Sequence, residues 1–307
     1  MTQERWTPEL GIIVRAAEGQ GALRDLDLQT VRDGVAEHGV MLLRGFTHDG
    51  LSDFQAFTER FGLPFLRHGG IAHQPLEGVV DTIRMVTSGT EAVGLHSEVS
   101  GLPVRPDYLW LHCVEPAKVG GETVLCDGVA LWSALPEPVQ QIFRERRLYY
   151  YSGDRGITPK EWKAAFNTED PDHAEARIEA FASTLDPRFE QMSLKRVEGD
   201  RFVGHYAVSA VVPSPYGQAE AFANALFGPY RVFPTFEGGE PVQDNLLNEI
   251  GAAMGPLCRR LQWQAGDVVM VDNWRVLHGR LPFLGTRRIV TRMGGTRCDF
   301  QLFSGPS

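Results

Sequence analysis

The chain has 307 residues, of which 43% are hydrophobic and 22% are charged, and its formal net charge is −9. This composition excludes a disordered or fibrous protein and provides enough apolar side chains for a substantial core. The acidic balance argues against nucleic acid and anionic membranes as partners, because both require a basic face on the protein.

Three further features predict where the protein resides. No stretch approaches the roughly 18 apolar residues that a membrane span requires. The N-terminal sequence MTQERWTPEL contains acidic residues and lacks the apolar core of a signal peptide. The four cysteines are scattered without a CxxC pair, which is typical of reduced thiols. We therefore expect a soluble, cytoplasmic protein.

The N-terminal part alternates helical and strand patterns. Residues 25–38 have apolar side chains at helical spacing, and residues 39–46 (GVMLLRGF) form an apolar run between glycines that predicts a buried strand. Residues 51–61 predict a second amphipathic helix, which Gly62 and a following proline end. Short β-rich segments then follow as far as about Asp127.

The middle of the chain is predicted to be mainly helical. Residues 129–187 carry helical patterns with one strand-like interruption at 148–152, and residues 218–227 and 243–257 predict two more helices. The C-terminal part returns to strand patterns.

Strands at both ends of the chain favour a β-sandwich or barrel whose sheets are completed by distant segments. A doubly wound α/β fold would require alternating units and a glycine-rich phosphate turn, and the sequence contains neither. No linker or internal repeat divides the chain. We expect a single domain over residues 1–307, with a variable helical insert at about 129–240.

A candidate metal site begins with His96 and Glu98, which are two residues apart. On a strand, this spacing places both side chains on one face. His278, near the end of an apolar β run, is the best candidate for a third ligand. Two histidines and one carboxylate form the facial triad of non-haem Fe(II) oxygenases, which keep positions open for a co-substrate and O2. An isolated HxE pair also arises often by chance.

Two arginines follow the third candidate ligand. Arg288 and Arg292 are four residues apart, so a strand would place both on one face. Arginine pairs with planar carboxylates and keeps its charge when buried. An arginine facing the iron site would therefore suit the distal carboxylate of 2-oxoglutarate. A solvated basic strand is the alternative interpretation.

Four segments, in this order along the chain, resemble the taurine dioxygenase-like, or clavaminate synthase-like, Fe(II)/2-oxoglutarate-dependent oxygenases. They are GVMLLRGF (39–46), FTERFGLP (57–64), HSEVSGLPVRPDYLWLHCVEPAKVGGETVLCDG (96–128) and VDNWRVLHGRLPFLGTRRIVTRM (271–293). The resemblance implies a mainly β fold with helical decoration around a double-stranded β-helix (jelly roll, cupin-like) core.

The resemblance also implies roles for individual residues. The acidic Glu98 argues against a halogenase, in which a small residue replaces the carboxylate. Which of the two arginines is the main 2-oxoglutarate anchor stays open, and Arg292 also matches an arginine that contacts the substrate. The implied metal ligands are His96, Glu98 and His278, and the implied 2-oxoglutarate ligands are Thr123, Arg288 and Arg292.

The implied activity uses Fe(II), 2-oxoglutarate and O2 to hydroxylate a small molecule, with release of succinate and CO2. An amino-acid-derived or other anionic metabolite of secondary metabolism, such as antibiotic biosynthesis, is the expected substrate. Desaturation or cyclisation, a carrier-bound substrate and a homo-oligomer stay open. The alternatives from other classes are a jelly-roll isomerase or hydrolase that uses another metal, and a binding protein without catalysis.

Most candidate substrate-binding residues precede His96 in the sequence. His68 and His73 fall in a segment that forms part of the substrate pocket in the resembling family, and Arg84 is a basic residue in an apolar strand. A solvent-exposed loop is the alternative position for the two histidines. Together with Arg292, these three residues complete the predicted substrate site.

Overall fold

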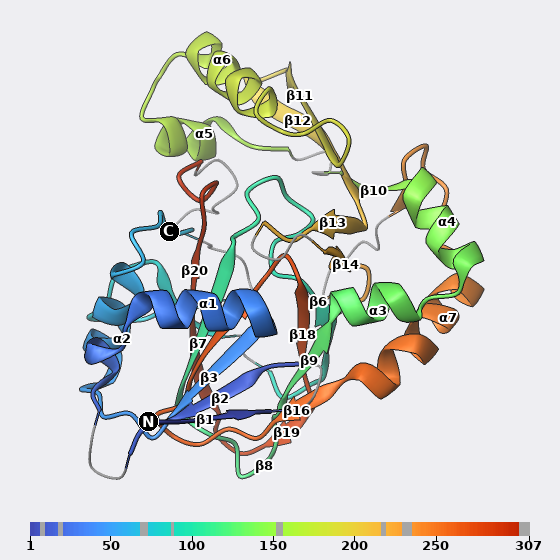
Figure 1. Ribbon diagram of the computed structural model, residues 1–307. Helices are drawn as coiled ribbons and strands as arrows, with labels where there is room; N and C mark the ends of the chain where they lie inside the picture. Colours follow the sequence, from blue (N-terminus) through green and yellow to red (C-terminus); the bar gives the residue numbers. More distant parts are fainter. Residues whose placement is uncertain are drawn as a thin grey trace.

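A computed structural model describes residues 1–6, 10–17, 21–67, 73–86, 89–151, 156–215, 219–228 and 235–300. Its centre consists of two sheets built from segments that are far apart in the sequence (Figure 1). The larger sheet has the strand order β1 (Thr2–Arg5), β2 (Ile12–Arg15), β3 (Val40–Arg44), β17 (Val268–Asp272), β7 (Tyr108–Glu115), β20 (Arg288–Gly294), β5 (Ile83–Val86) and β4 (His73–Pro75). The smaller sheet has the order β16 (Arg259–Leu261), β9 (Thr123–Asp127), β18 (Val276–Arg280) and β6 (Val93–His96).

The central strands of the larger sheet are apolar on both faces. In β3, Val40 and Leu42 belong to the core between the sheets. Met41 and Leu43 belong to a second core on the other side of the strand. Because successive side chains of a strand point to opposite faces, a strand that is buried on both sides needs a continuous apolar run. This explains the sequence of residues 39–46, and the predicted strand is confirmed.

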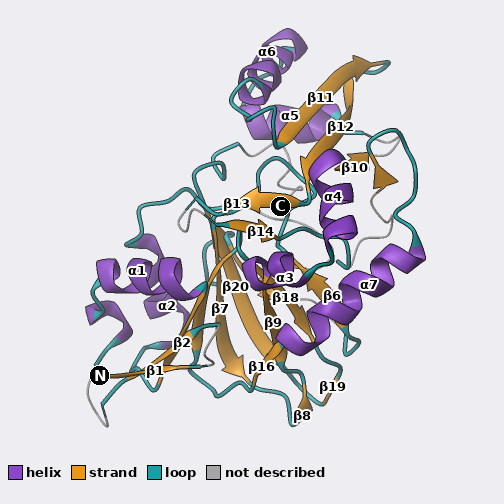
Figure 2. Cartoon of the chain, turned by 45° about the vertical axis from the view of Figure 1, so that its right-hand side comes forward, coloured by secondary structure: helices purple, strands orange, loops and turns teal. Residues whose placement is uncertain are grey.

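Helices cover the outer faces of both sheets (Figure 2). Helices α1 (Leu28–His38) and α2 (Gly50–Glu59) pack on the larger sheet, and α3 (Gly128–Ala134) and α7 (Asp244–Met254) flank the smaller one. The Asp27 side chain caps α1 by accepting a hydrogen bond from the Thr30 backbone N–H. The predicted helices at 25–38 and 51–61 are confirmed. Short 3-10 turns lie at Leu23–Asp25 and Gly255–Leu257.

The region predicted as a helical insert is helical only in part. It contains α4 (Glu137–Glu145), α5 (Pro159–Phe166) and α6 (Pro171–Ala182). The same region contains a four-stranded sheet with the order β11 (Glu190–Val197), β12 (Arg201–Ser209), β10 (Arg147–Tyr151) and β15 (Thr235–Phe236), in which β10 precedes α5 and the other strands follow α6. The strand expected at 148–152 is thus present, whereas the β11–β12 hairpin was not predicted.

The predicted helix at 218–227 is wrong. A short strand, β14 (Glu220–Phe222), pairs with β13 (Val211–Pro213) there. Tertiary packing explains the difference, because Phe222 is fully buried between Trp132 and Phe143 and pairs with Val211. A second small pair, β8 (Val119–Gly120) with β19 (Phe283–Leu284), lies at one end of the central sheets.

The expected fold class is confirmed. The chain is mainly β with helical decoration, and its two central sheets form an open sandwich rather than a closed barrel. None of the helices in the described part of the chain has the length and apolar character needed to cross a bilayer.

Candidate metal centre and co-substrate pocket

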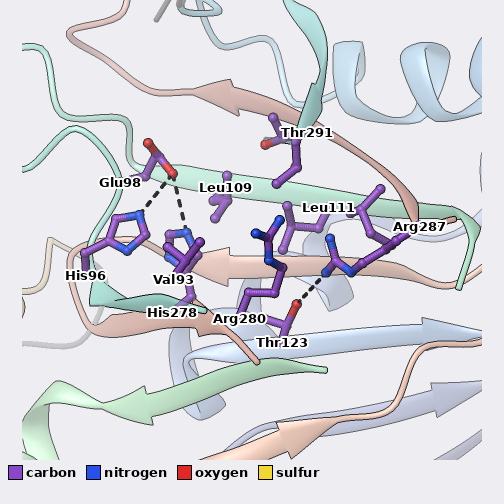
Figure 3. Close-up of a pocket in the computed structure, with 13 residues that line it drawn as sticks. Val93, His96, Glu98, Leu109, Leu111, Thr123, His278, Arg280, Arg287 and Thr291 are labelled. Atoms are coloured by element: carbon purple, nitrogen blue, oxygen red, sulfur yellow. Dashed lines mark hydrogen bonds and ion pairs between the residues drawn. The ribbon is translucent and has the colours of Figure 1, made fainter. Parts of the chain in front are cut away.

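The three predicted metal ligands lie together. Strand β6 ends at His96, which pairs directly with His278 on β18, and Glu98 follows in the turn after β6. The Glu98 Oε2 atom lies 3.6 Å from His96 Nε2 and 3.4 Å from His278 Nε2. All three side chains are buried, and their candidate donor atoms lie within 4.8 Å of one another. Figure 3 shows the carboxylate pointing toward both imidazoles.

The pKa values of the two histidines shift in opposite directions. Burial and the neighbouring His96 lower the pKa of His278, so its imidazole is neutral. Burial also acts to lower the pKa of His96, but the hydrogen bond and the charge of Glu98 outweigh it and raise that pKa. The His96 Nδ1 atom lies 2.9 Å from the Gly94 carbonyl oxygen. A proton on Nδ1 would donate to that carbonyl and leave Nε2 free to bind a metal.

The donor set therefore fits a divalent iron ion. Two imidazole nitrogens and one carboxylate oxygen lie close together, and as ligands of an octahedral ion they would leave three positions for other ligands. Without a cation, these acceptor atoms would face one another in a buried site, which costs free energy unless a proton is shared between them. The three side chains can hold a metal ion.

The triad lies in a pocket between the two central sheets. Leu109, Leu111, Ile289 and Thr291 form the wall on the larger sheet. The space between the walls is about 600 Å³, part of which is open solvent. The apolar wall keeps water from part of this space.

Two arginines and a threonine form the polar end of the pocket (Figure 3). Arg287 Nε donates to the Gly121 carbonyl oxygen at 3.0 Å, and its Nη2 lies 3.5 Å from Thr123 Oγ1. Arg280 is two residues beyond His278 on β18, so it shares the face of the metal ligand. Burial lowers the pKa of Arg287 to about 10, and the charge of Arg280 contributes to this shift. Both guanidinium groups are charged at neutral pH.

The prediction that Arg288 and Arg292 face the iron site is wrong. Arg288 is exposed and does not line the pocket. Arg292 is buried on the α2 side of β20, where its Nη1 donates to Thr58 Oγ1 at 2.7 Å and its guanidinium lies 3.6 Å from the centre of the Phe65 ring. On β20 the pocket side is occupied by Ile289 and Thr291, which alternate with the arginine positions.

The remaining predicted substrate residues have different outcomes. His68 lies outside the described residues. For His73 the backbone forms the start of β4, whereas its side chain is outside the described part. Arg84 is 5% exposed and pairs with Thr291 across the β5–β20 ladder. It also shares a strand face with Val86, which lines the pocket. Arg84 thus lies beside the pocket.

Two pocket residues, Arg280 and Arg287, were missed by the sequence analysis. The sequence contained a signal for each. Arg280 follows His278 at the same two-residue spacing that identified the HxE pair, and Arg287 is the first member of the arginine doublet. The register of β20 against β7 determines which arginine of the doublet faces inward, and this register cannot be predicted from residue spacing.

A buried triad of two histidines and a carboxylate, open to a pocket between the sheets of a jelly roll, defines a class of non-haem iron oxygenases. The sequence profile of the family described as taurine catabolism dioxygenase TauD, TfdA family matches residues 13–293, and the chain belongs to that family. It is an Fe(II)- and 2-oxoglutarate-dependent oxygenase.

Individual relatives agree with this assignment. The chain is 27% identical to a clavaminate synthase-like protein of Arabidopsis thaliana, over 84% of this chain and 82% of the relative. It is 25% identical to an alpha-ketoglutarate-dependent sulfate ester dioxygenase of Pseudomonas putida, over 93% and 87%. The crystal structure of a taurine dioxygenase from Burkholderia xenovorans superposes with a TM-score of 0.63 at 17% identity, covering 96% of this chain and 88% of that one. The last likeness supports the fold.

Proposed function

We propose that this enzyme hydroxylates a small anionic metabolite, with His96, Glu98 and His278 as the iron ligands. The observation that carries the proposal is the convergence of the triad, the buried Arg280 and the partly buried Arg287 on one pocket. Bound Fe(II), together with 2-oxoglutarate and O2, supplies the oxidising power for hydroxylation, with succinate and CO2 as co-products.

Within this proposal, Arg287 and Thr123 bind the distal carboxylate of 2-oxoglutarate. A guanidinium and a hydroxyl that lie 3.5 Å apart can both donate to one carboxylate. The Trp263 Nε1–H donates to Thr123 Oγ1 at 3.0 Å, so the hydroxyl proton is free to point at the carboxylate. The Gly121 carbonyl fixes the direction of Arg287. These contacts prepare the polar end before the co-substrate arrives.

The charges in the pocket favour an anionic substrate. Glu98 contributes one negative charge, and Arg280 and Arg287 contribute two positive charges. The charge of Fe(II) and that of the 2-oxoglutarate dianion cancel each other, so the loaded pocket keeps one net positive charge. An anionic group on the substrate would neutralise it. Arg84, beside Thr291, adds a further cation at the border of the pocket.

Relatives act on several substrate classes, which sets the range to test. One is the dapdiamide synthesis protein DdaC of Enterobacter agglomerans, which is 23% identical over 83% of this chain and 82% of the relative, and the Pseudomonas putida relative is named for sulfate esters. Amino-acid derivatives, free or carrier-bound, and sulfated or sulfonated small molecules are therefore the first candidates. A metabolite of secondary metabolism fits the former group.

A succinate-release screen tests the proposal. Purified enzyme with Fe(II), ascorbate, O2 and 2-oxoglutarate is incubated with amino acids, sulfonates, sulfate esters and uncharged analogues of the same size. We expect substrate-dependent succinate release with anionic compounds, and loss of it in His278→Ala. Hydroxylation of uncharged analogues at equal kcat/KM would contradict the anionic substrate. Activity that persists in His278→Ala would contradict the proposed triad.

A further inference from the structure

The backbone that carries Glu98 is strained. Val99, directly after Glu98, has φ 56°, in the left-handed region, and its side chain is buried. A β-branched residue avoids this region, and such strain persists only where the surroundings enforce it. Within the same turn, Ser100 N–H donates to the Ser97 carbonyl and Leu102 N–H to the Val99 carbonyl. Neither of these bonds engages the N–H or the carbonyl of Glu98 itself.

The side chain of Asn273 holds both backbone groups of Glu98. Its Oδ1 accepts from the Glu98 N–H at 2.7 Å, and its Nδ2 donates to the Glu98 carbonyl oxygen at 2.9 Å. The same Nδ2 donates to the Pro106 carbonyl oxygen at 3.0 Å. Asn273 is fully buried. A single amide thus pairs with Glu98 in the way that a neighbouring strand would.

Asn273 is itself fixed by a buried cluster. Arg105 Nη2 donates to the Asn273 carbonyl oxygen at 2.5 Å, and the Asn273 N–H donates to the Asp107 carbonyl oxygen at 3.0 Å. The Arg105 guanidinium lies 4.5 Å from the centre of the Trp274 ring, and Trp274 Nε1–H donates to Asp107 Oδ1 at 3.0 Å. Asn273 therefore offers Glu98 a rigid partner rather than a mobile one.

The position of Asn273 in the chain links the two halves of the triad. It lies in the turn between β17 and β18, and β18 carries His278 five residues later. Glu98 follows β6, which pairs with β18 through His96 and His278. One side chain thus ties the backbone of the carboxylate ligand to the loop that leads into the strand of the second histidine.

We propose that Asn273 is a positioning residue that holds Glu98, against the strain at Val99, in the orientation needed to bind the metal. This inference rests on the proposed triad. An amide of this length can accept from one backbone N–H and donate to two carbonyl oxygens at once. An aspartate at this position could accept from the Glu98 N–H but could not donate to the carbonyls of Glu98 and Pro106. An alanine would leave all three backbone groups without this partner.

The test measures metal binding by purified apo-protein rather than activity. Co(II) is titrated into the wild type, Asn273→Ala, Asn273→Asp and Glu98→Ala, and the visible absorption reports both affinity and coordination. We expect Asn273→Ala to bind Co(II) about 10- to 100-fold more weakly, as is typical of residues that orient a metal ligand. Its spectrum should shift toward that of Glu98→Ala. Ile250→Val, in the core behind the smaller sheet, is the control for a general loss of stability.

Substitutions of Val99 provide a second, independent test of the inference. Val99→Gly and Val99→Ala both remove a buried side chain, but only glycine relieves the positive φ. In the Asn273→Ala background, Val99→Gly should recover part of the Co(II) affinity and Val99→Ala should not.

The outcomes separate the two claims. Wild-type affinity and spectrum in both Asn273 variants, with only a lower melting temperature, would overturn the inference while leaving the triad intact. If Asn273→Ala does not fold, the titration of Asn273→Asp decides in the same way. Unchanged binding in Glu98→Ala would overturn the proposed triad and the inference with it.

Discussion

Arg287 and Arg288 are neighbours in the chain, yet only Arg287 enters the pocket. Arg287 lies 3.5 Å from Thr123 Oγ1 and is held by the Gly121 carbonyl, whereas Arg288 is exposed at the start of β20. The pairing of β20 with β7 shifts register between Arg288 and Ile289. This irregularity lies next to the doublet, where the chain enters the strand.

The doublet provides a matched pair of variants. Arg287→Met should raise the KM for 2-oxoglutarate by roughly 10- to 100-fold, because it removes charged hydrogen bonds worth about 1.5–3 kcal/mol. Arg288→Met should leave that KM within about twofold of the wild type, since an exposed arginine contributes little to a site it does not line. Initial rates of succinate formation at varied 2-oxoglutarate measure both. An effect of equal size in the two variants would contradict the proposed role of Arg287.

Arg292 is expected to stabilise the fold rather than bind the co-substrate. It ties β20 to α2 through Thr58 Oγ1 and the Gln55 carbonyl, and it pairs with Glu59 at 3.3 Å. Arg292→Met should lower the free energy of unfolding by about 2–3 kcal/mol, because it leaves buried acceptors without a donor. Urea denaturation measures this loss, and the KM for 2-oxoglutarate should not change in the folded variant. A raised KM with unchanged stability would reverse this assignment.

Arg84 should affect the binding of the substrate and not that of 2-oxoglutarate. Its side chain shares the face of Val86 beside the pocket, and its Nε donates to the Asp81 carbonyl at 2.7 Å. Arg84→Gln should raise the KM for an anionic substrate about 10-fold, the size of one lost charge-assisted hydrogen bond. The KM for 2-oxoglutarate should stay constant. Equal changes in both values would mean that Arg84 acts through the structure of the pocket instead.

The buried His112 should make stability depend on pH. Burial lowers its pKa from 6.5 to about 4. The unfolded chain therefore binds the proton between about pH 6.5 and pH 4, whereas the folded chain does not, and stability falls as the pH drops through this window. The full effect is at most about 3 kcal/mol. The loss of stability is complete below about pH 4, and the stabilisation is fully present above about pH 6.5.

A variant separates the contribution of His112 to this pH dependence from that of the other titrating groups. In His112→Asn, which keeps a polar group near the Asp267 carbonyl, the slope of unfolding free energy against pH between 4 and 6.5 should be smaller than in the wild type. Urea titrations at half-unit pH intervals give both slopes. Equal slopes would show that His112 titrates normally in the folded protein.

The iron triad could be predicted from the sequence because its signal is local. The HxE spacing pointed to His96 and Glu98, although Glu98 lies in the turn after β6 and not on the strand, and the apolar run before His278 identified the strand that pairs with β6. The orientation of β20 could not be predicted in this way. Spacing says which side chains of a strand share a face, but which face meets the pocket depends on pairing with β7 and β5, which are distant in sequence.

The errors in the central region also have physical causes. In β11 only Met192 and Leu194 alternate with polar neighbours, and most of the strand is exposed or partly exposed, so the apolar alternation was too short to identify a strand. Helix propensity favoured 218–227, but pairing of Phe222 with Val211 and its burial against two aromatic rings determine the strand there. Asn273 has no distinctive spacing, and its contact with Glu98 joins residues 175 positions apart.

The most direct test of the proposed iron centre is an anaerobic absorption spectrum. Apo-protein is mixed with Fe(II) and 2-oxoglutarate without O2, and the weak visible charge-transfer band of the chelated co-substrate is recorded for the wild type, Glu98→Ala and His278→Ala. We expect the band in the wild type and its loss in both variants. A wild-type protein without the band, or a band of equal strength in Glu98→Ala and His278→Ala, would contradict the assignment of iron to this triad.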